Sequence, residues 1–182
     1  MVMAWPYAYP KEDLHEGVEV SGIAHNDMHL KNVMVDGFDY GEHMLAPKLK
    51  VIDFGKYTET GGPEKNIYQI GLLMYYLMTG SDELTWNNQR LTARIFGEEA
   101  VISTRAVNLA PEKHQYLDTD LRGLVIWCLA AEPDKRPSIS RLVHIVGNRM
   151  REMTPDKYAG SESGPYETDE AIAYWLQNTM SA

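Results

Sequence analysis

Oxygen-bearing side chains stand in this sequence at spacings suited to metal and phosphate chemistry. Asp27 and Asn32 lie five positions apart, and Asp53 directly follows the short apolar stretch 49–52. Mg²⁺ prefers carboxylate and amide oxygens. Three such side chains can together hold Mg²⁺ and orient a hydroxyl group. They could therefore support phosphoryl transfer, which depends mainly on positioning and charge neutralisation. The alternative is that Asp27 and Asn32 cap a turn and that Asp53 ends a strand.

The two segments together resemble the catalytic loop and the Asp-Phe-Gly motif of the protein-kinase-like superfamily. The loop corresponds to residues 25–32 and the motif to residues 53–55. The resemblance implies that Asp27 is the catalytic base, that Asn32 is a metal ligand and that Asp53 is the main Mg²⁺ ligand. It also implies that ATP and Mg²⁺ are the cofactors, with Asn32 and Asp53 as the cofactor-binding residues.

Two further positions of the loop are candidates for catalysis by the same resemblance. His29 stands where Ser/Thr kinases have a lysine and where aminoglycoside and choline kinases have a histidine. Lys31 stands where tyrosine kinases have an arginine, so it could supply the positive charge for the transferred phosphate. Asn26 replaces the arginine that senses a phosphorylated activation loop in the family, and the segment after Gly55 is much shorter than an activation loop.

A second resemblance lies near the end of the chain. Residues 129–138 are similar to the protein-kinase signature Leu-x-x-Asp-Pro-x-x-Arg-Pro-Ser, which small-molecule kinases generally lack. In the family this arginine pairs with the glutamate of an Ala-Pro-Glu motif, which makes Arg136 and Glu64 the candidate pair. The alternative is an exposed arginine beside a proline turn.

The helix expected at 66–78 resembles the central helix of the kinase C-lobe. Its apolar residues recur every three or four positions, and Gly80 follows as a terminator. The family usually begins this helix with an aspartate that accepts hydrogen bonds from the catalytic-loop amides. Asn66 replaces that aspartate here, and its amide oxygen can still accept such bonds.

The remaining periodicities predict a mainly α fold with a small β-hairpin, of the α+β class and similar to a kinase C-lobe without its N-lobe. The polar connection of the hairpin is expected at 36–47, and a helix with Asp118 or Thr119 as its cap over 116–131. Further helical segments are expected at 11–20, 91–96 and from Thr168 onward.

The predicted organisation is a C-lobe-like domain over 1–153, with a hinge-like segment at 1–10, a linker at 154–165 and an amphipathic tail helix at 166–182. The sequence has no Gly-rich loop, no strand with a phosphate-binding lysine and no helix with its glutamate partner. These features define the N-lobe in the family, so the sequence resembles the C-lobe alone.

Composition limits the classes of function. The chain has 182 residues, 44% of them hydrophobic and 24% charged, as in a soluble globular domain. Its net charge of −9 argues against a nucleic-acid partner. The sequence has no apolar run of membrane-spanning length and no secretory signal, and its single cysteine, Cys128, excludes an internal disulfide. We therefore expect a cytoplasmic or nuclear location, no membrane partner and a buried Cys128.

Three functions remain open at this point. The first is a kinase fragment or pseudokinase, ancestrally an ATP- and Mg²⁺-dependent phosphotransferase acting on protein and inactive unless an N-lobe is supplied. The second is a non-catalytic scaffold module that binds protein partners. The third is a small-molecule kinase, which His29 favours and the signature at 129–138 disfavours. The expected partners are the missing N-lobe, another protein or a second copy of the chain, with the tail helix as a cover for the exposed floor of the cleft.

Overall fold

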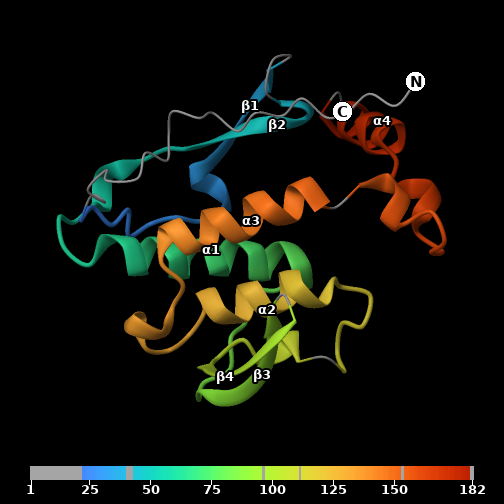
Figure 1. Cartoon of the computed structure of the whole chain (residues 1–182). Helices are drawn as coiled ribbons and strands as arrows, with labels where there is room; N and C mark the ends of the chain where they lie inside the picture. Colours follow the sequence, from blue (N-terminus) through green and yellow to red (C-terminus); the bar gives the residue numbers. More distant parts are fainter. Residues whose placement is uncertain (1–21, 40–42, 96, 111, 153, 181–182) are drawn as a thin grey trace. The chain divides into compact units, whose positions relative to one another are not determined.

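The computed structural model describes residues 22–39, 43–95, 97–110, 112–152 and 154–180. Within these ranges the chain forms four α-helices and two separate two-stranded sheets, so the α+β class is confirmed (Figure 1). The hinge-like segment at 1–10 and the helix expected at 11–20 lie outside the described residues. None of the described helices is long and apolar enough to cross a membrane.

The described residues fall into two compact units. The core unit comprises residues within 19–33 and 51–139, and the tail unit comprises residues within 34–50 and 140–182. The boundaries predicted at 153 and 165 stay predictions. Short 3-10 turns occur at Pro155–Lys157 and Gly164–Tyr166 in the expected linker.

The tail unit includes most of a hairpin and two helices. Strand β1 (Val33–Asp39) pairs with β2 (His43–Val51), and an ion pair of 2.7 Å joins Lys50 to Asp36. The small hairpin expected from the sequence is therefore present. Helix α3 spans Ile139–Glu152 and α4 spans Asp169–Met180. The hydroxyl of Thr168 accepts a hydrogen bond from the N–H of Ala171, which caps α4.

Helix α1 (Gly62–Thr79) is the longest helix described in the core unit. It begins four residues before the predicted start, because Pro63 has the backbone angle that the first helical turn requires and needs no N–H partner there. It ends at Gly80, which adopts a positive φ of 67° and donates its N–H to the carbonyl of Tyr76. The predicted glycine terminator is confirmed.

Helix α2 (Thr119–Cys128) is shorter than the predicted 116–131. The carboxylate of Asp118 accepts a 2.8 Å hydrogen bond from the N–H of Leu121, so Asp118 is the cap and the helix starts after it. Leu117 lies before the cap and still packs against the core. Apolar periodicity alone does not separate a helical residue from an apolar neighbour of the helix, which explains the overestimated length.

The prediction of helical turns at 91–96 is wrong. Strand β3 (Gln89–Ile95) pairs antiparallel with β4 (Glu98–Thr104), with Leu91 opposite Ile102 and Ala93 opposite Ala100. Burial alternates along β3, where Leu91, Ala93 and Ile95 are less exposed than their neighbours. A period of two is the pattern of a strand with one buried face, and Gly97 with a φ of 85° permits the tight turn.

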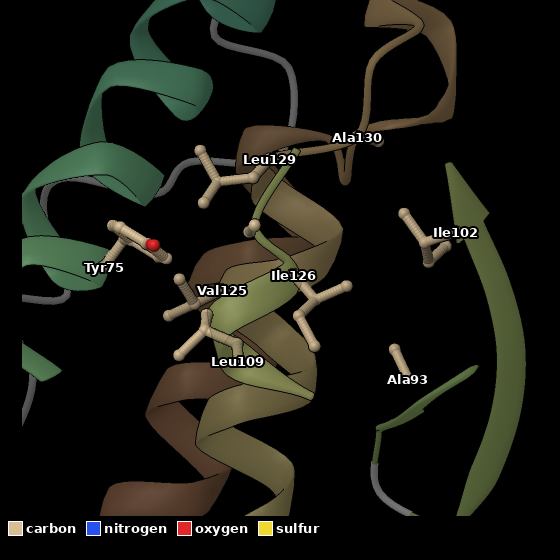
Figure 2. Packing of buried hydrophobic residues seen from close by; sticks show 9 residues of the cluster. Tyr75, Ala93, Ile102, Leu109, Val125, Ile126, Leu129 and Ala130 are labelled. Atoms are coloured by element: carbon tan, nitrogen blue, oxygen red, sulfur yellow. The ribbon is translucent and has the colours of Figure 1, made fainter. Parts of the chain in front are cut away.

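The hydrophobic core of the core unit forms where α2 packs between α1 and the β3–β4 hairpin. Figure 2 shows Val125 and Leu129 on the side of α2 that faces Tyr75, and Ile126 on the side that faces Ala93 and Ile102. Cys128 is buried beside this core, and burial raises the pKa of its thiol to about 12. The thiol therefore stays neutral and packs as a small apolar group, as the sequence indicated.

Close backbone contact at Gly123 generates a prediction about stability. A Cβ atom at Gly123 would lie 2.0 Å from the carbonyl oxygen of Arg94, so α2 and β3 can approach this closely only with glycine. We expect Gly123→Ala to lower the free energy of unfolding by about 1–3 kcal/mol, despite the better helix propensity of alanine.

Urea denaturation followed by circular dichroism would measure this change. The matched control is Gly160→Ala, where an added Cβ has nothing within 4 Å, and we expect almost no change there. A Gly123→Ala protein as stable as the wild type would contradict the packing of α2 on β3.

Candidate functional site

His25 connects the predicted catalytic loop to the rest of the core unit. Its side chain is 2% exposed. Its ring Nε2 lies 2.9 Å from the carbonyl oxygen of Ile52, and its Nδ1 lies 3.3 Å from the N–H of Asp27. A carbonyl only accepts and an N–H only donates, so Nε2 has the proton and the imidazole is neutral. The ring of Phe54 packs on it at a centroid distance of 4.6 Å.

Asn66 holds the chain just before the loop from the first turns of α1. Its Oδ1 accepts a 2.9 Å hydrogen bond from the N–H of His25, and its Nδ2 donates a 2.9 Å bond to the carbonyl oxygen of Ile23. The expectation that the amide oxygen still accepts from the loop agrees with this geometry. The second bond is one that a carboxylate could not make, because a carboxylate has no donor.

Asn32, Asp27 and His29 lie together within the loop. Asn32 is 7% exposed, and its Nδ2 donates a 2.9 Å hydrogen bond to the carbonyl oxygen of Asp27. The Nε2 of His29 lies 3.4 Å from the same Nδ2 and 3.8 Å from Oδ1 of the Asp27 carboxylate. The amide of Asn32 is therefore oriented with its nitrogen toward Asp27, which leaves its oxygen directed elsewhere.

Asp53 directly follows Ile52, whose backbone is hydrogen-bonded to the loop at residues 25–32. The N–H of Ile52 donates to the carbonyl oxygen of Asn32 at 2.9 Å, while the carbonyl of Ile52 accepts from His25. Asp53 itself has a positive φ of 62°, which is uncommon for a residue other than glycine, and its Oδ1 accepts from the N–H of Gly55 at 3.2 Å. Its other carboxylate oxygen remains available, and the residue is exposed.

Lys56 is the residue that sequence reasoning missed. Its ammonium group lies 2.9 Å from Oδ2 of Asp27. This hydrogen bond is the main cause that lowers the pKa of Asp27, and the same bond raises the pKa of Lys56, with a smaller contribution from Asp53. A lysine three positions after Asp53 in a tight turn was the available signal. Lys31, the lysine predicted to act in catalysis, is exposed, and its role stays a prediction.

Asn26 holds the turn that contains Lys56. Its Nδ2 donates to the carbonyl oxygen of Lys56 at 3.0 Å and to the hydroxyl of Thr58 at 2.9 Å. Its backbone has a positive φ of 61°, a conformation that asparagine tolerates better than most residues. Ala24 and Thr58 exchange backbone hydrogen bonds of 2.8 and 2.9 Å, which fix the same turn from the other side. Asn26 thus positions the segment after Gly55 through direct hydrogen bonds.

The side chain of Arg136 contacts the main chain of Glu64. Its guanidinium donates to the carbonyl oxygens of Glu64 at 2.9 Å and of Ala130 at 2.9 Å, and its centre lies 4.6 Å above the ring of Tyr68. Arg136 and Glu64 are thus in contact, and this hydrogen bond goes to the main-chain carbonyl of Glu64. The contact ties residues 130–136 to the start of α1.

The metal ligands predicted from the sequence are the side-chain oxygens of Asp53 and Asn32. Among the described residues, no group of three or more His, Cys, Asp or Glu side chains could hold a metal ion. Asp53 and Asn32 form a smaller set, one carboxylate and one amide oxygen, of the hard type that Mg²⁺ accepts. Such a set would need further oxygens, for example from phosphate groups, to complete an octahedron.

The two bonds of Asn66 generate a prediction. Asn66→Asp keeps the acceptor for His25 but places a carboxylate oxygen against the carbonyl of Ile23. We expect it to lower the free energy of unfolding by about 1–3 kcal/mol, the cost of losing a hydrogen bond and leaving its acceptor unsatisfied. Urea denaturation at neutral pH measures the change.

The control is Asn87→Asp, which adds the same charge at an exposed position of the core unit and should change stability by less than about 0.5 kcal/mol. Equal stability of Asn66→Asp and the wild type would show that the bond to Ile23 contributes nothing.

The Lys56–Asp27 ion pair generates a prediction about pH. Because the folded pKa of Asp27 is lowered, its stabilising effect is present above the ordinary aspartate pKa of about 3.9 and is lost as the pH falls through the lowered value. Lys56→Met should return the Asp27 pKa toward the ordinary value. The stability difference from the wild type should therefore shrink below about pH 4.

Carboxyl-carbon NMR titration of Asp27 measures this directly. Lys50→Met, which removes another exposed ion pair with Asp36, serves as the control and should leave the titration of Asp27 unchanged. If Lys56→Met also leaves the Asp27 pKa lowered, the ion pair is not its cause.

Comparison with known proteins gives one distant similarity. No protein-family model matches the chain. Over 88% of its length the chain is 23% identical to a "Dual serine/threonine and tyrosine protein kinase" of Apis mellifera. The chain spans about a fifth of the length of that curated relative, since the match covers 19% of it. The similarity points to a relationship with protein kinases.

Proposed function

We propose that this chain is a C-lobe-like domain of the protein-kinase-like superfamily that keeps the phosphotransfer residues and does not transfer phosphate on its own. The main support is the hydrogen-bonded connection of His25 and Asn32 to Ile52. This connection brings the loop with Asp27 and Asn32 beside the turn that starts with Asp53. The match to a protein kinase over most of the chain agrees with this proposal.

In this proposal each residue has a distinct chemical role. The carboxylate of Asp27 would accept the proton of an acceptor hydroxyl group. Asp53 and the side-chain oxygen of Asn32 would hold Mg²⁺. When bound with ATP, Mg²⁺ would neutralise part of the charge of the phosphate groups. The geometry fits this assignment, because the amide nitrogen of Asn32 is fixed on the carbonyl of Asp27 and its oxygen is left for a ligand.

Two features support the absence of independent activity. The carboxylate of Asp27 is paired with the ammonium of Lys56 at 2.9 Å, so one of its two oxygens is already engaged. The elements that hold nucleotide phosphates in the family, a Gly-rich loop and a strand lysine, would have to come from another segment or another chain. Losing single parts of such sites typically costs factors of about 10² to 10³ in rate.

The second candidate is a non-catalytic interaction module. The Lys56–Asp27 pair favours it, since an internal cation can stabilise the loop without any metal or nucleotide. In this case the loop residues contribute to folding only, and the exposed aromatic residues Phe54 and Tyr57, 54% and 52% exposed, would be free to contact a partner.

Metal binding separates the two candidates. We expect Mn²⁺ to broaden NMR signals near residues 32 and 53 and to do so weakly, because phosphate oxygens are missing from the site. Asp53→Ala should abolish the broadening, whereas Asp82→Ala, at another exposed aspartate of the core unit, should leave it unchanged. Broadening that persists in Asp53→Ala would remove the support for a metal site and favour the interaction module.

Activity is tested on the purified chain with ATP and Mg²⁺. We expect no transfer of labelled phosphate to the chain itself or to generic protein substrates. Transfer that disappears in Asp27→Asn would show that the chain is active alone and that its nucleotide site has been overlooked.

A further inference from the structure

A polar cavity lies in the core unit, separate from the candidate site. Its volume is about 230 Å³, and six residues line it: Tyr68, Asn88, Arg105, Leu129, Ala131 and Arg136. The polar members include two guanidinium groups and one amide, and the lining includes no acidic residue. The cavity is thus lined by two positive charges in a chain whose net charge is −9.

Both guanidinium groups are held in place by neutral main-chain oxygens. The Nε of Arg105 donates a 2.6 Å hydrogen bond to the carbonyl of Thr85, and the N–H and hydroxyl of Thr85 both donate to the carbonyl of Arg105. A bond through Nε leaves the terminal nitrogens of Arg105 for the cavity. Arg105 is thus fixed in position before any ligand arrives.

Arg136 is fixed in the same way. Its Nε, Nη1 and Nη2 donate to the carbonyls of Ala130, Glu64 and Ala131 at 2.9, 2.9 and 3.4 Å. These bonds use three of its five N–H donors. Burial lowers the pKa of Arg136, and Tyr68 and then the carboxylate of Glu64 oppose this lowering as lesser influences.

We propose that this cavity, named here the Arg105–Arg136 cavity, is a binding site for a phosphate-type oxyanion. Arginine presents its donors in a planar fork that matches tetrahedral oxyanions, and prearranged donors bind with less ordering cost. Asn88 adds a neutral donor at the wall, while Leu129 and Ala131 supply the apolar part of the lining. The oxyanion is either free phosphate or the phosphate monoester of a side chain, which share this chemistry.

The experiment measures anion binding to the full chain by NMR chemical-shift titration. Sodium phosphate is compared with sodium chloride at equal ionic strength, and phosphoserine is titrated in parallel. We expect saturable shifts of the Arg105 and Arg136 side-chain signals with phosphate and not with chloride. Tighter binding of phosphoserine identifies a phosphorylated side chain as the ligand, and equal or weaker binding identifies free phosphate.

Variants make the assignment specific. Arg105→Gln keeps a donor for Thr85 but removes the charge, and it should weaken phosphate binding at least tenfold. Asn88→Ala, which leaves both arginines and their main-chain bonds in place, should weaken binding two- to fivefold. Arg94→Gln, at an exposed arginine on β3 outside the cavity, is the matched control and should bind phosphate as the wild type does. Thermal melting of each variant confirms that it is folded.

Two results would overturn the proposal. One is the absence of saturable shifts with both phosphate and phosphoserine in the wild type. The other is an equal loss of binding in Arg105→Gln and Arg94→Gln, which would show that phosphate responds to surface charge in general. Neither result bears on Asp27 or Asp53, so the proposed function is tested separately.

Discussion

The geometry of the candidate site depends on the buried, neutral imidazole of His25. Its ring joins the loop at Asp27 to the segment before Asp53, and its main-chain N–H is held by Asn66 at the start of α1. A ring that both donates and accepts must be neutral, so the site tolerates no second proton on His25 without losing one of these bonds. Three segments distant in the sequence are thereby fixed by one side chain and its backbone.

Features set by local sequence patterns were largely predictable. The glycine at position 80, the aspartate cap at 118 and the apolar spacing of α1 each reflect short-range chemistry, and the structure contains all three. The oxygen of Asn66 was expected to accept from the loop because of the resemblance of residues 66–71 to the start of the central kinase C-lobe helix. Its second bond, to Ile23, could not be foreseen, because it depends on the close approach of Gly62 to residues 22 and 23.

Features set by long-range contacts were missed. Helical turns were predicted at 91–96, where the structure has the β3–β4 hairpin, because a short apolar stretch fits the period of a helix as well as that of a strand. The packing of β3 on α2 at Gly123 distinguishes the strand from the helix. Lys56 was overlooked for a similar reason. Its partner, Asp27, is 29 positions earlier in the chain, and their contact exists only because Asn26 and Thr58 fold the turn back onto the loop.

The contacts of Lys56 and Asn26 explain how the loop is stable with the carboxylate of Asp27 at its centre. A carboxylate charge is stabilised by a nearby cation, by hydrogen-bond donors or by solvent. In this chain Lys56 balances the charge of Asp27 from within the fold, and Asn26 holds the turn that contains Lys56. The short amide side chain of Asn26 suits its left-handed backbone. Asn26 and Lys56 thus form one arrangement, in which the segment after Gly55 supplies the positive charge that stabilises the loop.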